Sequence, residues 1–548
     1  MADDIKNECL QHLKSLKNEQ EQWRTHWQEM AEYMLPYKEK YLNGVADPTK
    51  DGKKKGRKIL NGVAGKAHTT LASGMQGGLT NPSRPWFLLS IQDEQLLEEE
   101  GVREWLHTVR QLMMSVFAKS NFYGSVHSIY RDLGLFGTAA MLIEEDTDTV
   151  IRLRPFTTGE YYLSLNDKYI PDTIYREFKM TAKQLLAKFG EENLSDAVKT
   201  SIKNNNIEDL YMVVHCIKPN AKINDRDENE YKSIYFELSS EDGKLLRESG
   251  YRTKPFVAPR WDVNGTDTYG ISPGMLALAD VMMLQKMEEK KLKALDKMVD
   301  PPMNAPTSMK RTGATIISGG VNYLDPAQGG QTFTPVYNVK PDLQNMAFEI
   351  DRVETRIKNY FFNNLFLAIL DQNKTMTATE VAQRTQEKLL ILGNVVDRTG
   401  TEMLNIVIER TYNIMLSMGL IPEPPEVIQG TEFNIEYISL LAQAQKVTGL
   451  SAIEQTAAFV GNLAGADPNV LDKFDFDQAV DEYAKTVGVP PTLIRSDTEV
   501  KKIRAAKAEA AQQAQQQQMM AAAPQAAKQL SDSKLGENNA LEVLTGRA

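Results

Sequence analysis

A block of two long helices around a small β insert constrains the fold of this chain more than any other segment. Helical periodicity predicts the first helix over 270–300, where two prolines stop it. The insert, 301–341, is rich in Gly, Pro and Thr, and a second helix is predicted over 342–369. A polar loop, 371–376, leads into a third long helix, 377–419. Two long helices joined at one end by a β tip form a protruding hairpin, which suits a subunit that packs beside copies of itself.

The bulk composition excludes several classes of protein. The chain has 548 residues, enough for more than one core, and its 42% hydrophobic and 25% charged residues are ordinary for a soluble protein. A net charge of −10 argues against a surface that coats nucleic acid generally, but it leaves room for a local basic stripe or a DNA channel. Cys9 and Cys216 are too few for a disulfide framework or a cysteine zinc site and fit a reducing compartment. The N-terminus has no apolar signal core, and no apolar run reaches roughly 18 residues, so we expect neither export nor membrane insertion.

The fold class predicted from periodicity is α+β and predominantly helical. An amphipathic helix is expected over 5–38, and small residues over 59–75 indicate a tightly packed helix. Shorter helices are expected over 433–494, and the Ala/Gln-rich segment from about Asp497 is either a solvated helix or disordered. Trp23, Trp27, Met30 and Met34 share the predicted buried face of the first helix. Antiparallel strands are predicted at 139–144, 149–155, 160–164, 173–178, 210–218, 231–238 and 245–251.

The first helix of the hairpin block has three chemically distinct sides. On a helical wheel Lys286, Lys290, Lys293 and Lys297 fall within roughly 60° of arc. An apolar face lies beside them, and acidic residues lie largely opposite. Either this is a solvated helix with salt bridges, or the lysines face a channel or a neighbouring copy. The apolar face is Met283, Met287, Ala294, Leu295 and Met298, and the acidic residues are Glu288, Glu289 and Asp296.

The second predicted helix has an apolar packing stripe, and the third begins with an N-terminal capping motif. Glu354 and Lys358 can pair at i, i+4, and the aromatic run 360–366 is expected to pack in a core. Thr377 and Glu380 match a capping box as N-cap and N3, so a strong helix start follows the polar loop. The stripe expected to pack on the first helix is Met346, Ile350, Val353, Ile357, Phe361 and Leu365.

The sequence gives no positive reason to propose catalysis, a cofactor or a metal. The nearest match to a phosphate-binding loop, 62–67, lacks the first glycine and has Ala67 where a magnesium-binding hydroxyl is required. The six histidines lie in the first 215 residues without ligand spacing. Glu144, Glu145 and Asp146 can be interpreted as a metal site, but a solvated acidic turn is the stronger interpretation.

Four runs in this order resemble the head-to-tail connector, or portal, proteins of short-tailed bacteriophages. The resemblance covers roughly residues 5–430, and the last hundred residues match only in being helical and Ala/Gln-rich. The four runs are Gly74 to Phe87 (GMQGGLTNPSRPWF), Asp132 to Ala139 (DLGLFGTA), Val299 to Pro302 (VDPP) and Met376 to Val381 (MTATEV).

The resemblance implies a portal fold of wing, stem, clip and crown that assembles as a ring of about twelve copies around a central channel. The implied wing is 1–267, and the stem helices are 268–300 and 342–370. The implied clip is 301–341, and its docking residues would be Asn322, Tyr323, Asp325 and Phe333. The implied tunnel loop consists of Asp371, Gln372, Asn373, Lys374, Thr375 and Met376. Residues 377–432 would then be a long wing helix and linker, 433–496 the crown, and 497–548 a barrel helix or a disordered tail.

The resemblance also implies partners and a location. Double-stranded DNA would pass through the channel, terminase would dock during packaging, and tail adaptor or nozzle proteins would dock afterwards. Major capsid and scaffolding proteins would surround the ring at the portal vertex of the virion, after assembly in the host cytoplasm and without a membrane. Two alternatives stay open: an internal scaffolding or core protein without a channel, and a packaging nucleotidase, against which the missing phosphate loop counts.

Overall fold

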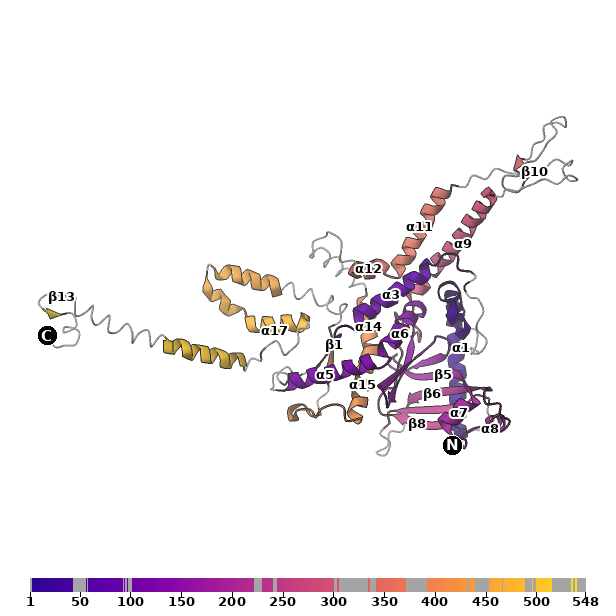
Figure 1. The fold of residues 1–548 in the computed structure, drawn as a ribbon, viewed down its shortest axis with the longest axis horizontal. Helices are drawn as coiled ribbons and strands as arrows, with labels where there is room; N and C mark the ends of the chain where they lie inside the picture. Colours follow the sequence, from indigo (N-terminus) through magenta and orange to yellow (C-terminus); the bar gives the residue numbers. More distant parts are fainter. Residues whose placement is uncertain are drawn as a thin grey trace. The chain divides into compact units, whose positions relative to one another are not determined.

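A computed structural model of the chain divides into two units (Figure 1). Unit 1 comprises Met1–Phe87, Gln111–Ile421 and Tyr437–Gly449, and unit 2 comprises Leu88–Arg110, Pro422–Glu436 and Leu450–Ala548. The structure describes residues 2–539 apart from 43–55, 57, 92, 94–95, 97–100, 221–228, 240–243, 300–302, 305–333, 336–341, 371–391, 431–432, 439–452, 466, 488–494, 496–498, 515–533 and 536–537.

The largest sheet of unit 1 is antiparallel and has the strand order β4-β5-β6-β7-β8. Because side chains alternate along each strand, Val214 and Cys216 of β6 lie in a core with helix α1 (Ala2–Met34), and Val213 lies in a core on the other face. That second core is covered by α7 (Ala182–Phe189) and α8 (Asp196–Lys203), so helices cover both faces. The strands are β4 (Tyr161–Leu165), β5 (Pro171–Thr181), β6 (Leu210–Pro219), β7 (Tyr231–Glu237) and β8 (Arg247–Tyr251), close to the predicted ranges.

Helix α1 buries the predicted stripe. Trp27, Met30 and Met34 are buried, and the Trp27 ring meets Tyr269 edge-on with ring centroids 5.2 Å apart. The predicted helix over 5–38 ends earlier, because a 3-10 turn (Pro36–Lys38) and the short helix α2 (Glu39–Leu42) follow Met34. This placement fixes the helix along the sheet and against the start of the hairpin block.

A second, three-stranded sheet has the order β3-β2-β9. The predicted hairpin is β2 (Ala140–Asp146) and β3 (Val150–Phe156), and β9 (Phe256–Val257) pairs with the other edge of β2. In the acidic turn Asp146 accepts hydrogen bonds from Thr149, and Glu144 pairs with Arg154 at 2.6 Å. These carboxylates therefore have local partners, and the described residues contain no cluster of three metal-ligating side chains.

Small residues bring helices α3 (Val63–Leu79) and α6 (Phe122–Phe136) close together. A Cβ added at Gly134 would lie 2.6 Å from the end of the Leu71 side chain, so Leu71 would have to move to admit any larger residue. Gly137 ends α6 with φ 78°, and a Cβ there would lie 2.0 Å from the Gly270 carbonyl oxygen. The tight packing predicted for 59–75 is confirmed, and α6 is fixed beside the segment that leads into the hairpin block.

The hairpin block consists of α9 (Pro273–Val299) and α11 (Leu343–Tyr360). The prediction of one helix over 342–369 is wrong, because a turn at Phe361 and Phe362 separates α11 from α12 (Asn363–Leu370). Phe362 has φ 53°, and the turn lets Phe361 pack against His68 while Phe362 stacks on Trp261. The core packing predicted for this aromatic run is therefore confirmed for Phe361 and Phe366, whereas Phe362 is half-buried and Tyr360 is exposed. In the insert the structure describes only β10 (Met303–Asn304) and β11 (Thr334–Pro335), which pair antiparallel.

The described part of the third long helix runs through α14 (Gly393–Thr399), a π-helical turn (Gly400–Leu404) and α15 (Asn405–Ser417). It ends at Gly419, which has φ 67°, in agreement with the predicted end.

Helix α5 (Val102–Lys119) belongs to unit 2 as far as Arg110 and to unit 1 from Gln111. The described part of unit 2 is otherwise mostly helical. Residues 453–464 and 499–514 are helical, and Arg504 of the latter makes two hydrogen bonds to Asp477, at 2.5 and 2.8 Å. The remaining elements are β1 (Phe87–Ile91), which pairs with β12 (Phe433–Tyr437), η4 (Glu426–Ile428), η5 (Pro468–Lys473), α17 (Phe476–Val487), and β13 (Lys534–Leu535) with β14 (Asn538–Asn539). No helix in the described ranges is long and apolar enough to cross a membrane.

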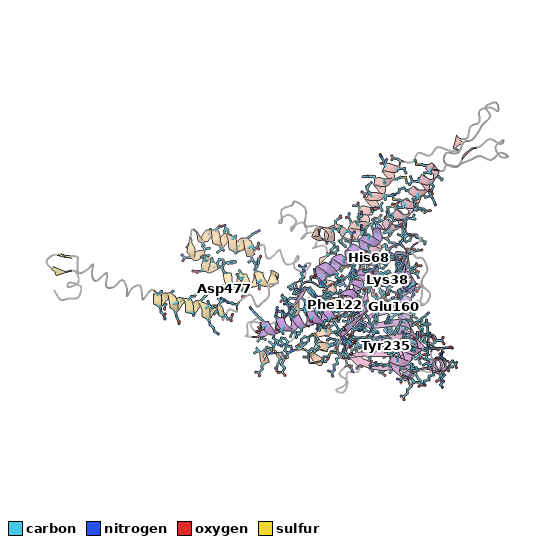
Figure 2. All side chains as sticks on the ribbon, in the orientation of Figure 1. Lys38, His68, Phe122, Glu160, Tyr235 and Asp477 are labelled. Carbon is cyan, nitrogen blue, oxygen red and sulfur yellow. The ribbon has the colours of Figure 1, made fainter. Side chains whose placement is uncertain are left out.

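His68, labelled in Figure 2, lies in α3. It is buried, and its burial makes the stability of unit 1 depend on pH. Its Nε2–H donates to the Arg131 carbonyl at 2.6 Å, and its buried Nδ1 has no hydrogen-bond partner. Burial lowers the pKa of His68 to about 4, because a second N–H would enter this site without an acceptor. Between pH 6.5 and 4 the unfolded chain therefore binds more protons, so this contribution is complete above about pH 6.5 and is lost as the pH falls.

We expect acidification from pH 7 to pH 5 to cost about 2 kcal/mol through His68 alone, since one and a half pH units at about 1.4 kcal/mol each separate pH 5 from the ordinary pKa. The raised pKa of buried Asp132 works in the opposite direction and is common to wild type and variant. Urea denaturation of wild type and His68→Gln at both pH values measures the difference. The same loss of stability in the two proteins would contradict the assignment.

Candidate functional site

The hairpin of α9 and α11 projects from unit 1 and packs along one seam (Figure 1). Ile350, Val353 and Ile357 of α11 are buried, as the predicted stripe requires, and Met346 is half-buried. From α9 the buried side chains include Val281 and Leu284. The predicted ion pair between Glu354 and Lys358 is present at 3.4 Å.

A loop just before α3 ties the two helices of the hairpin together. Buried Gln285 of α9 accepts hydrogen bonds from the backbone N–H groups of Leu60 and Asn61, at 2.7 and 2.9 Å, and donates to the Asn61 carbonyl at 2.8 Å. The Asn61 side chain donates to Glu288 of α9 at 3.1 Å and to Glu354 of α11 at 2.9 Å. We call Asn61, Gln285, Glu288 and Glu354 the hairpin clamp. No local sequence pattern predicts the hairpin clamp, because Asn61 and its partners on the two helices are more than two hundred residues apart.

The four predicted lysines of α9 are all exposed, and we call Lys286, Lys290, Lys293 and Lys297 the lysine flank. On the helical wheel this flank points roughly opposite the buried face. Lys293 pairs with Glu289 one turn away. The acidic side is smaller than predicted, because Glu288 turns inward to the hairpin clamp and to Lys291, at 2.8 Å, while Asp296 is exposed.

The apolar face of α9 predicted from sequence is not its buried face. Met283 and Met298 keep 38% and 45% of their surface exposed, and Leu276 on the same line keeps 61%. We call Leu276, Met283, Met287, Ala294 and Met298 the apolar flank. Met287 and Ala294 are half-buried, so within the described part of the chain three large apolar side chains of this flank, Leu276, Met283 and Met298, stay exposed on a projecting helix.

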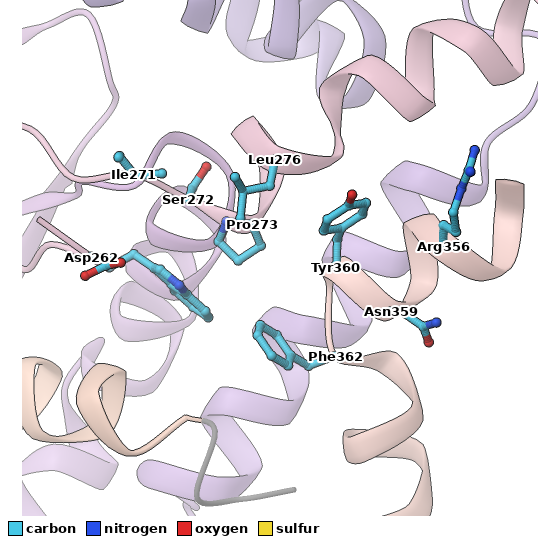
Figure 3. Close-up of a pocket in the computed structure, with 10 residues that line it drawn as sticks. Asp262, Ile271, Ser272, Pro273, Leu276, Arg356, Asn359, Tyr360 and Phe362 are labelled. Carbon is cyan, nitrogen blue, oxygen red and sulfur yellow. The ribbon is translucent and has the colours of Figure 1, made fainter. Parts of the chain in front are cut away.

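A hollow of about 390 Å³ lies where the apolar flank begins (Figure 3). Leu276 and Pro273 lie on one side and Tyr360 and Phe362 on the other. Trp261 also lines the hollow. Arg356 of α11 lies at the rim and bonds Asp280 of α9 at 3.0 Å. Asp262, Ile271, Ser272 and Asn359 complete the lining. The hollow therefore combines apolar walls with a charged residue, Arg356, at its rim.

A buried ion pair that sequence reasoning missed fixes the third long helix. Arg260 donates to Glu402 from its backbone N–H at 2.9 Å and from its guanidinium at 2.8 Å, and it also donates to the Tyr169 carbonyl at 2.9 Å. Glu402 lies in the π-helical turn and also pairs with Arg398. Because a buried charge needs partners, this pair fixes the position of the helix that follows 371–391.

Several predicted site residues lie outside the described residues and stay predictions. These are the tunnel-loop residues 371–376, the helix cap formed by Thr377 and Glu380, and the clip residues Asn322, Tyr323, Asp325 and Phe333.

Comparison with known proteins adds a family to this geometry. A profile of the family described as "Bacteriophage head to tail connecting protein" matches residues 6–494. The protein named "Portal protein" of Salmonella phage epsilon15 is 40% identical over 554 aligned positions, which cover 100% of this chain and 99% of that protein. The "Probable portal protein" of Bordetella phage BPP-1 is 37% identical over 538 positions, which cover 97% and 96%.

We expect Gln285→Leu to lower the free energy of unfolding by about 2 kcal/mol, because two backbone N–H groups lose their acceptor in a half-buried site. The matched control is Lys286→Leu, which places the same side chain on the exposed neighbour and is expected to change stability by less than about 0.5 kcal/mol. Urea denaturation measures both. Equal stability of the two variants would show that the clamp contributes nothing.

Proposed function

We propose, from the premise that this chain belongs to the bacteriophage head-to-tail connecting protein family, that its copies close into a ring through which double-stranded DNA enters and leaves the capsid. The protein is a portal protein of the phage virion, with a structural and not an enzymatic role. Beyond this portal role, we propose that the protein forms a ring of about twelve copies around a central channel.

The main support for a ring is the exposed apolar flank of α9. Leu276 and the methionines after it line one side of a projecting helix, together with a hollow that the same unit leaves open. In a ring each copy presents two different faces to its two neighbours, so the face that holds both the flank and the hollow can meet a different face of the next copy. Such a contact removes the flank from water, which is the main favourable term in assembly.

The lysine flank gives the ring its proposed orientation. It points roughly opposite the buried face of α9 and about 80° of arc away from the apolar flank. If the apolar flank meets a neighbour, the lysines turn toward the axis and α9 forms the inner wall. With 27 residues, α9 is about 40 Å long, so it can line a channel through a capsid shell.

The remaining assignments follow the family and are proposals. Residues 1–267 form the wing, α9 and α11 the stem, and 301–341 the clip. The clip docks the terminase during packaging and the tail adaptor or nozzle afterwards. Residues 371–376 form the tunnel loop, 433–496 the crown and 497–548 a barrel helix. Capsid and scaffolding proteins surround the ring, which nucleates the procapsid in the host cytoplasm.

We expect Leu276→Asp to weaken ring assembly at least about tenfold, because a carboxylate in an apolar contact loses its hydration. Sedimentation velocity and negative-stain images of the purified protein measure the assembly, and circular dichroism checks the fold. The control is Ile170→Asp, which changes another exposed apolar residue (44% exposed) in the turn between β4 and β5. Wild-type particles without a central hole would refute the ring and favour an internal scaffold.

We expect substitution of the whole lysine flank by glutamine to leave rings intact and to change DNA passage. Each lysine that contacts a phosphate adds about 0.9 to the steepness with which the logarithm of the DNA-binding constant falls with the logarithm of the salt concentration. Packaging by the glutamine variant should therefore vary less with salt than packaging by the wild type. The measurement is DNA packaged per particle across a salt series. Unchanged packaging at every salt concentration would show that the lysine flank does not contact DNA in the channel. A control with the same change in charge substitutes the exposed lysines Lys119, Lys168, Lys183 and Lys203.

A further inference from the structure

The two cysteines of the chain meet in the core between α1 and the five-stranded sheet. Cys9 of α1 and Cys216 of β6 are both fully buried in one cluster with Tyr175 and Val214. They are 207 positions apart in the sequence, and both thiols are free. The sequence holds no third cysteine, so an intramolecular disulfide in this protein can only join this pair.

Contacts on either side fix the register of α1 over the sheet at this point. One residue before Cys9, Glu8 pairs with Lys218 at 2.6 Å, and Lys218 lies two positions after Cys216 on the same face of β6. One turn after Cys9, His12 lies 3.2 Å from the Tyr175 hydroxyl, and Tyr175 is the direct partner of Cys216 across the β5–β6 ladder. Cys9 is therefore held over Cys216 by neighbours on both sides.

We propose that Cys9 and Cys216 form a redox pair, which a peroxide converts into a disulfide that links α1 to β6. The Cys9 thiolate attacks one peroxide oxygen and the O–O bond breaks, which gives a sulfenic acid and a hydroxide ion. The hydroxide takes up the proton that the Cys9 thiol released and leaves as water. The Cys216 sulfur then attacks the Cys9 sulfur, the S–O bond breaks, and the Cys216 proton leaves with the hydroxyl as a second water. Two thiols lose two electrons and two protons, and the peroxide is reduced to two waters.

The surroundings favour Cys9 as the attacking sulfur. A hydrogen bond from the Cys216 thiol lowers the pKa of Cys9, and the positive charge of Lys218 acts in the same direction. Burial raises the pKa of Cys216, which keeps that sulfur protonated until it attacks. The pair lies beneath the partly exposed Glu8–Lys218 ion pair, so a small oxidant needs only a local opening of the first turns of α1 to reach it.

The experiment treats the purified full-length chain with hydrogen peroxide and measures its intact mass and a peptide map without reductant. The expected result is loss of the mass of two hydrogens and one peptide that contains both cysteines. The melting temperature should rise by about 5 °C or more, because the bridge closes a long loop, and a dithiol reductant should reverse the change.

The matched variant is Cys216→Ser, which should gain an oxygen at Cys9 that a sulfenic-acid probe captures, and should form no internal bridge. If this variant fails to fold, the wild-type mass and peptide map decide alone. Wild type that only gains oxygen, that links chains into dimers, or that stays unreacted while the urea-unfolded chain reacts would overturn the proposal. A bridge that leaves the melting temperature unchanged would overturn its stabilising role.

Discussion

Two helices that pack along one seam bury one face each, and any further surface that the rest of their own chain does not cover must meet solvent or another chain. The hairpin of α9 and α11 depends on this constraint. Its seam takes Val281 and Leu284 from one helix and Ile350 and Val353 from the other, and the apolar flank of α9 is left over. A monomer gains nothing from a line of exposed methionines on a projecting helix, whereas a ring of copies can bury one such line at every interface.

The body of unit 1 holds the hairpin at a fixed angle through buried polar contacts as well as apolar packing. The hairpin clamp satisfies backbone donors of the loop before α3, and the Arg260–Glu402 pair fixes the third long helix where its ladder widens into a π turn. Removing one partner from such a contact leaves a buried group unpaired, which costs more than the intact contact contributes. These contacts therefore define position more than they add stability, as the proposed channel wall would require.

Much of this architecture could be predicted from the sequence, because it follows from local periodicity. The strands of the five-stranded sheet, the buried face of α1 and the stripe of α11 lie where alternation and helical spacing place them. The break at Phe362 could not be predicted, since Trp261, one hundred and one positions away, makes that turn favourable. The inward turn of Glu288 depends equally on Asn61, which no local pattern connects to α9. The apolar flank was visible as a pattern, but only the structure separates it from the buried face.

The charge of the chain is consistent with a wall that guides DNA without holding it. A net charge of −10 repels a polyanion overall, so attraction is restricted to small areas such as the lysine flank. Within that flank Lys293 is paired with Glu289, which reduces the positive charge that a passing phosphate meets. In the proposed ring, weak contacts repeated at about one helical turn along α9 would let DNA move from one lysine to the next with no deep free-energy minimum. A flank of unpaired lysines would instead bind DNA tightly at low salt, and tight binding opposes movement in both directions.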